Sequence, residues 1–196
     1  MKTINLKSIG IFVLAFSLTT AVFAETKKVD VTKSVVNWEG KKIAGAHNGT
    51  IGIKEGQLDL NNKSLTGGKI VIDMSSMKNL DLTNAEYNGK LMGHLKSDDF
   101  FSVATYPTSE LVIKKVESNG RTHTFTGDLT IKGVTNPVTF AATESKEGNT
   151  MAYKGTLTID RSKYNVRYGS KSFFNDIGDK AIDDNFTLDF NLVVAE

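Results

Sequence analysis

Apolar and polar side chains alternate along most of this chain with a period of two, which is the pattern of a half-buried β-strand. In the clearest run, residues 124–131, threonines and an aspartate occupy one face. The opposite face carries Phe125, Gly127, Leu129 and Ile131. Lys132-Gly133 interrupts the run, and the alternation resumes beyond Pro137. The stretch therefore predicts two antiparallel strands and a short connection.

Similar alternation recurs along the rest of the chain. The positions that share a face are Val36 and Trp38; Ile51 and Ile53; Ile70, Ile72 and Met74; Met151, Tyr153, Leu157 and Ile159; and Phe186, Leu188, Phe190, Leu192 and Val194. Residues 111–113 add a strand that is apolar on both faces. Turn signals separate these runs at Glu55-Gly56, Gly67-Gly68, Ser118-Asn119-Gly120 and residues 146–149. Seven or eight strands with close turns predict an all-β antiparallel sandwich or barrel.

One segment, residues 84–96, has a different period. Asn84 is a suitable N-cap, and Tyr87, Leu91 and Leu95 recur every four positions after it. This spacing predicts a short amphipathic helix. The two glycines inside the segment each cost about 1 kcal/mol relative to alanine, so tertiary contacts must hold the helix in place. It either plugs one end of a barrel or forms a mobile lid.

Two further features bear on whether such a barrel is hollow. Gly127 and Gly155 lie on the apolar face in the middle of strands, where they either leave space for a ligand or mark bends and bulges. Many aromatic side chains lie outside the strands, where they either line a barrel mouth or pack loops against its exterior. These are Phe100, Phe101, Tyr106, Tyr164, Tyr168, Phe173 and Phe174.

The first residues have the pattern of a targeting signal. Lys2 and Lys7 precede an apolar run over residues 9–18, and residues 22–24 form a small-residue cleavage site. This pattern predicts a secretory signal peptide over residues 1–24, export to the periplasm or the exterior, and one domain over residues 25–196. The apolar run is shorter than the roughly 20 residues of a spanning helix, so we expect no stable membrane insertion.

Charge and cysteine content exclude several function classes. Lys2 and Lys7 account for the whole excess of 24 basic over 22 acidic residues, so the remaining chain has no net charge. Its lysines are scattered, which argues against a nucleic-acid partner. The chain has no cysteine, which excludes disulfides, thiol nucleophiles and thiolate metal sites.

The sequence contains no recognisable catalytic or metal-binding motif. His47, His94 and His123 are far apart, and none has the spacing of a metal-ligand pair. The acidic residues between 176 and 184 lack the pattern of a calcium loop. Nucleophile-elbow and phosphate-loop motifs are also absent from the sequence. We therefore predict a protein that is not an enzyme and has no cofactor or metal.

Several motifs resemble the YceI-like family of exported lipid-binding proteins. Residues 127–138 are similar to the family's G-x-L-T-I-[RK]-G-V-T-x-P-V run, and residues 95–101 followed by Tyr106-Pro107 are similar to a second family segment. Residues 160–164 look like its R-S-x-[FY] signature, and His47 lies near its early histidine. The resemblance covers nearly the whole chain after residue 24. It departs at Ser102, where the family usually has aspartate, and in residues 81–94, which lack the R-D-x-H-L pattern.

The resemblance implies an extended, lipocalin-like antiparallel β-barrel with a helical segment and an elongated apolar pocket. The implied function is non-catalytic binding of a polyisoprenoid or quinone-like lipid. The alternative is a packed barrel that docks another exported protein through its aromatic loops. The oligomeric state stays open, a homodimer included.

Strand register then predicts the ligand-binding residues. Those expected inside the barrel are Phe125, Gly127, Leu129, Phe140, Tyr153, Gly155, Leu157, Leu188 and Phe190. Those expected at its mouth are Tyr87, Leu91, Leu95, Phe100 and Phe101. A slip of one residue would reverse the contribution of any strand.

Overall fold

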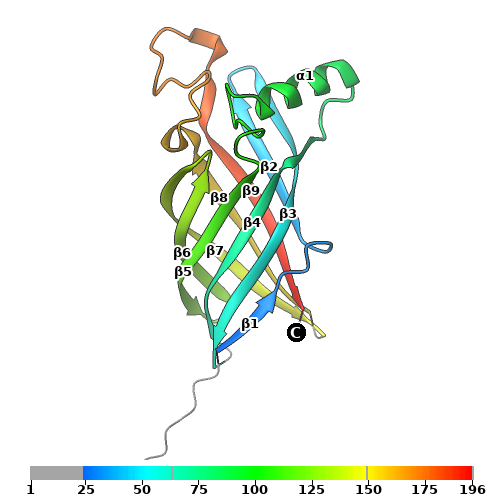
Figure 1. The fold of residues 1–196 in the computed structure, drawn as a ribbon, viewed down its shortest axis with the longest axis vertical. Helices are drawn as coiled ribbons and strands as arrows, with labels where there is room; N and C mark the ends of the chain where they lie inside the picture. Colours follow the sequence, from blue (N-terminus) through cyan, green and yellow to red (C-terminus); the bar gives the residue numbers. More distant parts are fainter. Residues whose placement is uncertain (1–23, 63, 149, 196) are drawn as a thin grey trace, which may run out of the picture.

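The computed structural model describes residues 24–62, 64–148 and 150–195, so the predicted signal peptide lies almost entirely outside the described residues. The chain forms an antiparallel β-barrel with a helix across one end (Figure 1). Its elements are β1 (Ala24–Lys28), β2 (Val35–Lys42), β3 (Gly45–Asn61), β4 (Ser64–Asn79), α1 (Ala85–Lys96), β5 (Thr108–Asn119), β6 (Thr122–Ile131), β7 (Val134–Glu147), β8 (Thr150–Asp160), η1 (Arg161–Tyr164), η2 (Gly178–Lys180) and β9 (Ile182–Ala195).

Eight strands close into a ring. The hydrogen-bonded order runs β3-β2-β9-β8-β7-β6-β5-β4, and pairing between β3 and β4 completes the circle. The short β1 pairs with residues 57–61 of β3, while β2 pairs with residues 45–51 of the same strand. Closure leaves no long unpaired edge, and it confirms the predicted all-β barrel of about eight strands.

The hairpin of β6 and β7 is the predicted pair of strands. Lys132 and Gly133 form its turn with φ of 49° and 74°, the positive values that a two-residue type I′ hairpin turn requires. Along β6, burial alternates without interruption, with Phe125 and Leu129 inward. Pro137 has no backbone N–H to donate. It is tolerated because β7 pairs only with β6 at this position, and the pairing of β7 with β8 begins at Ala142.

Two of the turns predicted from the sequence are wrong. Glu55-Gly56 lies inside β3, and Gly67-Gly68 lies inside β4. The pairing of these strands shifts register between Ile53 and Glu55 and again near residue 59. Strands of 17 and 16 residues must bend to close a narrow barrel, and such shifts supply the bend.

Gly127 and Gly155 also mark close approach rather than empty space. A Cβ on Gly127 would lie 2.3 Å from the carbonyl oxygen of Val112 on β5. A Cβ on Gly155 would lie 2.4 Å from the carbonyl oxygen of Ala141 and 2.8 Å from Cζ of Phe190. Both glycines therefore let a neighbouring strand or ring approach. The structure contradicts the view that they leave interior volume.

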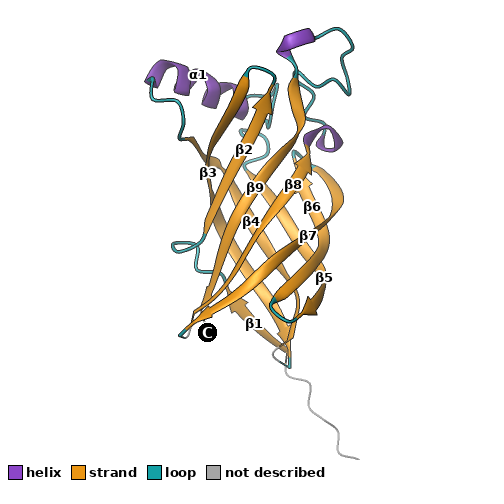
Figure 2. Cartoon of the chain, turned by 180° about the vertical axis from the view of Figure 1, so that it is seen from behind, coloured by secondary structure: helices purple, strands orange, loops and turns teal. Residues whose placement is uncertain are grey.

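The helix begins as predicted. The Asn84 side chain accepts hydrogen bonds from the backbone N–H groups of Glu86 and Tyr87, and α1 then runs to Lys96. Figure 2 shows α1 at the same end of the barrel as the β2–β3 turn and the 161–181 segment, with the C-terminus at the opposite end. Among the described residues, no helix is long and apolar enough to cross a membrane.

Candidate functional site

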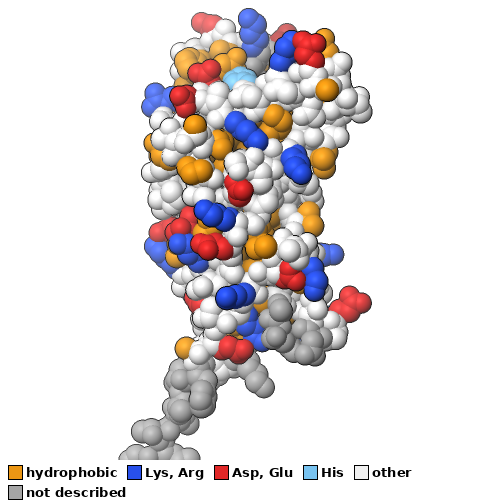
Figure 3. Space-filling view, turned by 45° about the vertical axis from the view of Figure 1, so that its right-hand side comes forward, with side chains coloured by type: hydrophobic (Ala, Val, Ile, Leu, Met, Phe, Trp, Pro, Cys, Tyr) orange, Lys and Arg blue, Asp and Glu red, His pale blue; other side chains and the backbone are white. Residues whose placement is uncertain are grey.

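The barrel encloses a cavity of about 500 Å³ at the end that carries α1. This volume lies within the usual range of small-molecule sites. Its apolar lining consists of Trp38, Ile51, Ile72, Met74, Met77, Leu91, Leu95, Phe100, Phe101, Leu129, Ile131, Ile159, Tyr168, Ile182, Phe186 and Leu188. Figure 3 shows hydrophobic side chains and a histidine at the surface of the same end, between charged side chains.

The cavity occupies only part of the barrel. On β9, Phe186 and Leu188 line it, whereas Phe190, further down the strand, lines a separate apolar void of about 20 Å³. On β6, Leu129 lines the cavity and Phe125 lines the void. The lower half of the barrel is therefore filled by its own side chains, and the pocket is shorter than the elongated one that the resemblance implies.

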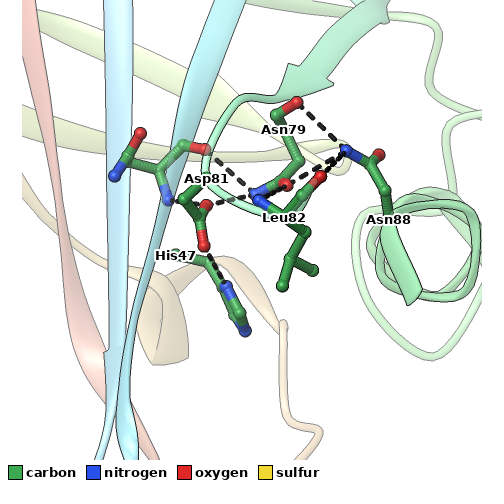
Figure 4. A network of polar contacts seen from close by, with 6 residues as sticks. His47, Asn79, Asp81, Leu82 and Asn88 are labelled. Carbon is green, nitrogen blue, oxygen red and sulfur yellow. Dashed lines mark hydrogen bonds and ion pairs between the residues drawn. The ribbon is translucent and has the colours of Figure 1, made fainter. Parts of the chain in front are cut away.

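Polar contacts join the wall of the cavity to the segment that leads into α1 (Figure 4). Asp81 is their centre. One of its carboxylate oxygens lies 2.7 Å from Nδ1 of the cavity-lining His47, and the other accepts a hydrogen bond from the backbone N–H of Asn48 at 2.9 Å. The Asn79 side chain donates a further hydrogen bond to Asp81.

These contacts lower the pKa of Asp81. Its partial burial opposes ionisation, but the hydrogen bonds from Asn48, His47 and Asn79 outweigh that effect and hold the pKa at about 2. Asp81 is therefore ionised above that pH, and its charge stabilises the turn between β4 and α1.

Asn88 continues the contacts into the helix itself. Its side-chain amide donates to the carbonyl oxygen of Leu82 at 3.0 Å and to both oxygens of Asn79, at 3.2 and 3.3 Å. The Asn79 side-chain oxygen also accepts from the backbone N–H of Leu82. The first half of α1 is thus fixed by hydrogen bonds, whereas its second half contributes Leu91 and Leu95 to the cavity.

Arg161 organises the other side of the mouth. Its side chain is 2 % exposed, and its guanidinium donates to four backbone oxygens at 2.8 to 3.0 Å. The acceptors are the carbonyl oxygens of Val166, Tyr168, Ile182 and Asp183. Asp184 lies 3.4 Å away and balances the charge, and the Phe100 ring lies beneath the guanidinium. With its donors engaged in this way, Arg161 holds the 161–181 segment against the barrel.

The three histidines occupy separate surroundings. His47 contacts Asp81, and His94 lies between the rings of Phe100 and Tyr168. His123 lies toward the end of the barrel opposite α1, where its ring contacts Ser118 and Glu144. Within residues 24–62, 64–148 and 150–195, no group of three potential ligands could hold a metal ion.

At the end of the barrel opposite α1, Tyr153 lies beside the Glu144 carboxylate. Its hydroxyl is 3.5 Å from Glu144 and donates to the sulfur of Met151 at 2.9 Å. Burial, together with the charge of Glu144, raises the pKa of Tyr153 to about 12. Tyr153, Glu144, His123 and Ser118 thus form a polar cluster at the end of the barrel opposite α1.

Six of the predicted binding residues line the cavity: Leu91, Leu95, Phe100, Phe101, Leu129 and Leu188. Four others line the lower void instead: Phe125, Phe140, Tyr153 and Phe190. Gly127, Gly155 and Leu157 line neither space. Tyr87 is 61 % exposed on α1 and faces away from the cavity. Contact of any of these residues with a ligand stays a prediction.

Sequence reasoning missed much of the cavity wall. Ile131 and Phe186 share faces with the predicted Leu129 and Leu188, so register alone could have included them. Trp38 and Met77 come from strands whose place in the ring is not visible in the sequence. Of the aromatic loop residues, Phe100, Phe101 and Tyr164 are buried, while Tyr106, Tyr168, Phe173 and Phe174 remain exposed.

Comparison with known proteins gives a family match over most of the chain. A family model for the YceI-like domain matches residues 28–194. Relatives called UPF0312 proteins include one from Pseudomonas putida, 37% identical over 81 residues, and one from Pseudomonas paraeruginosa, 27% identical over 119 residues. The first match covers 38% of this chain and 42% of its relative, and the second covers 58% and 60%. This chain thus spans less than two thirds of these relatives.

Solved structures share the fold. BcnA from Burkholderia cenocepacia aligns with a TM-score of 0.64 at 26% identity, covering 84% of this chain and 98% of BcnA. A polyisoprenoid-binding domain from Saccharophagus degradans aligns with a TM-score of 0.63 at 17% identity, covering 86% and 97%. The YceI protein of Campylobacter jejuni aligns with a TM-score of 0.55 at 17% identity, covering 100% and 99%.

Proposed function

Because this chain belongs to the YceI-like family, we propose that it binds a long apolar isoprenoid-type lipid, polyisoprenoid or quinone-like, in the cavity beneath α1. The protein is a binding protein rather than an enzyme, in line with its family and its polyisoprenoid-binding structural relative. In this proposal it carries or sequesters the lipid without changing it.

The observation that carries the proposal is a 500 Å³ cavity whose wall is mainly apolar. Its most buried charged group, Arg161, already donates to four backbone oxygens. Such a wall stabilises a ligand chiefly by removing its apolar surface from water, at about 25 cal/mol per Å². A long hydrocarbon tail fits that requirement.

The alternative, a solid barrel that docks another exported protein, has weaker support. It requires an interior filled by side chains, whereas the barrel contains a cavity of about 500 Å³. Its one supporting feature is the exposed aromatic loop, where Phe173 and Phe174 are 40 % and 48 % exposed.

The proposed setting is the periplasm or the exterior. The support is the signal-peptide pattern of residues 1–24. A lipid that must cross an aqueous compartment has its tail shielded from water by such a cavity.

The first test is mass spectrometry of organic extracts from protein purified without detergent from its native host. We expect an isoprenoid-type lipid in stoichiometric amount. Repeated extracts with no apolar molecule would overturn the proposal.

A matched pair of variants locates the ligand. Leu188→Trp places a large ring in the cavity. Thr187→Trp places the same ring on the preceding residue of β9, whose side chain points to the outer face of the barrel. We expect Leu188→Trp to fold but carry little lipid, and Thr187→Trp to carry as much as the original protein. Equal lipid content in the two variants would place the ligand elsewhere.

A further inference from the structure

A layer of aromatic rings lies below the cavity and lines the small void there. On three strands the lining changes from one space to the other within two to four residues. The pairs are Ile72 and Ile70 on β4, Leu129 and Phe125 on β6, and Leu188 and Phe190 on β9. Because strands from different parts of the ring change together, the boundary crosses the whole barrel.

Three phenylalanines form the layer. Phe125 and Phe140 are directly opposed on β6 and β7, and their rings are stacked, with centroids 5.2 Å apart and planes 9° apart. The Phe190 ring meets Phe140 edge-on, at 5.6 Å and 86°. Parallel and perpendicular contacts of this kind hold rings in defined orientations, so the layer is a packed wall.

The backbone is adapted to this layer. Gly155 is paired directly with Phe190, and a Cβ on Gly155 would lie 2.8 Å from the tip of the Phe190 ring. Any side chain at position 155 would displace the ring. The space that the sequence suggested beside Gly155 is therefore occupied by the Phe190 ring.

We propose that this aromatic floor, Phe125, Phe140 and Phe190, limits the tail length of the lipid that the cavity accepts. The inference rests on the proposed function. A tail that enters from the mouth reaches the end of the cavity above these rings, and further isoprene units find no space inside the barrel. The ligand class is thus an isoprenoid lipid whose tail is no longer than the cavity can bury.

The experiment measures binding of an alcohol series, geraniol, farnesol, geranylgeraniol and geranylfarnesol, in which each member is one isoprene unit longer. Trp38 is the single tryptophan and lines the cavity, so its fluorescence reports binding. In the original protein we expect at least about tenfold tighter binding for each unit that becomes buried, and then a plateau. In Phe190→Ala, which enlarges the void beneath the cavity, the plateau should move to a longer alcohol.

Phe186→Ala is the matched control. It removes a ring of the same size from the cavity wall above the floor, so binding of all alcohols should weaken without moving the plateau. If Phe190→Ala does not fold, as judged by circular dichroism, Phe190→Leu gives the same test with a smaller cavity.

Two failures are distinguishable. No binding of any alcohol would overturn the proposed function and this inference with it. Affinity that rises along the whole series in the original protein, or a plateau that Phe190 variants leave unmoved, would overturn the aromatic floor alone.

Discussion

Gly127→Ala tests whether the mid-strand glycine serves close packing or leaves space. The new Cβ would lie 2.3 Å from the Val112 carbonyl oxygen, and real Cβ atoms essentially never approach closer than 3.0 Å. The strands β5 and β6 must therefore separate by about 0.7 Å at this point, which follows from those two distances. A ladder hydrogen bond of ordinary length would then exceed the accepted range.

The expected loss follows from these displacements. Overpacking costs about 1–3 kcal/mol, and one weakened ladder bond costs about 1 kcal/mol. The lower chain entropy of unfolded alanine offsets up to about 1 kcal/mol. We expect Gly127→Ala to lower the free energy of unfolding by about 2 kcal/mol, which corresponds to about 4–8 °C in Tm for a domain of this size.

Urea unfolding followed by circular dichroism and by Trp38 fluorescence measures the change. Gly89→Ala is the control, because a Cβ on Gly89 meets nothing within 4 Å and alanine favours the helix by up to about 1 kcal/mol. If the Gly127→Ala protein is as stable as the original, β5 does not lie too close for a side chain at position 127. The alternative, that Gly127 leaves space inside the barrel, would then hold.

Three further predictions concern the mouth of the barrel. Arg161→Met leaves four carbonyl oxygens without their donor, so we expect about 3 kcal/mol less stability and faster proteolysis within residues 161–181; cleavage at an unchanged rate would contradict the role of Arg161. Because the pKa of Asp81 is lowered to about 2, its ionised form adds about 1–2 kcal/mol to the free energy of unfolding above the ordinary pKa of 3.8, and this contribution is lost as pH falls through 2. The difference in unfolding free energy between the original protein and Asp81→Asn should therefore shrink as pH falls from 3.8 to 2. A difference that stays constant would argue against this role of Asp81. Asn88→Ala removes the hydrogen bonds to Asn79 and Leu82, so amide hydrogen exchange in α1 should accelerate about tenfold while exchange in β6 is unchanged. Equal acceleration in both elements would mean that α1 opens only together with the barrel.

Much of the fold was predictable because its signals are local. The alternation through Phe125 and Leu129 depends only on successive side chains pointing to opposite faces of a strand. The start of α1 depends on one side chain, Asn84, that bonds N–H groups two and three residues away. The false turn signals at Gly56 and Gly68 arose because a bend in a long strand uses the same residue type as a turn.

The candidate site was less predictable because it is assembled from distant segments. Leu129 and Leu188 were found from their strand faces, but Trp38 and Met77 reach the same cavity only because of the ring order. Arg161 stood in a recognised motif, yet its role requires carbonyl groups up to 22 residues away along the chain.

The sequence by itself determined most of the strand segments, the inward face of each predicted strand and where the helix begins, since each depends on neighbours along the chain. Only the tertiary structure decided where the barrel is hollow. Interior volume at a given depth depends on how many side chains from all eight strands reach that level, and on how closely the strands approach. Gly155 shows this dependence, because the space beside it is occupied by the Phe190 ring of a strand about 35 residues away.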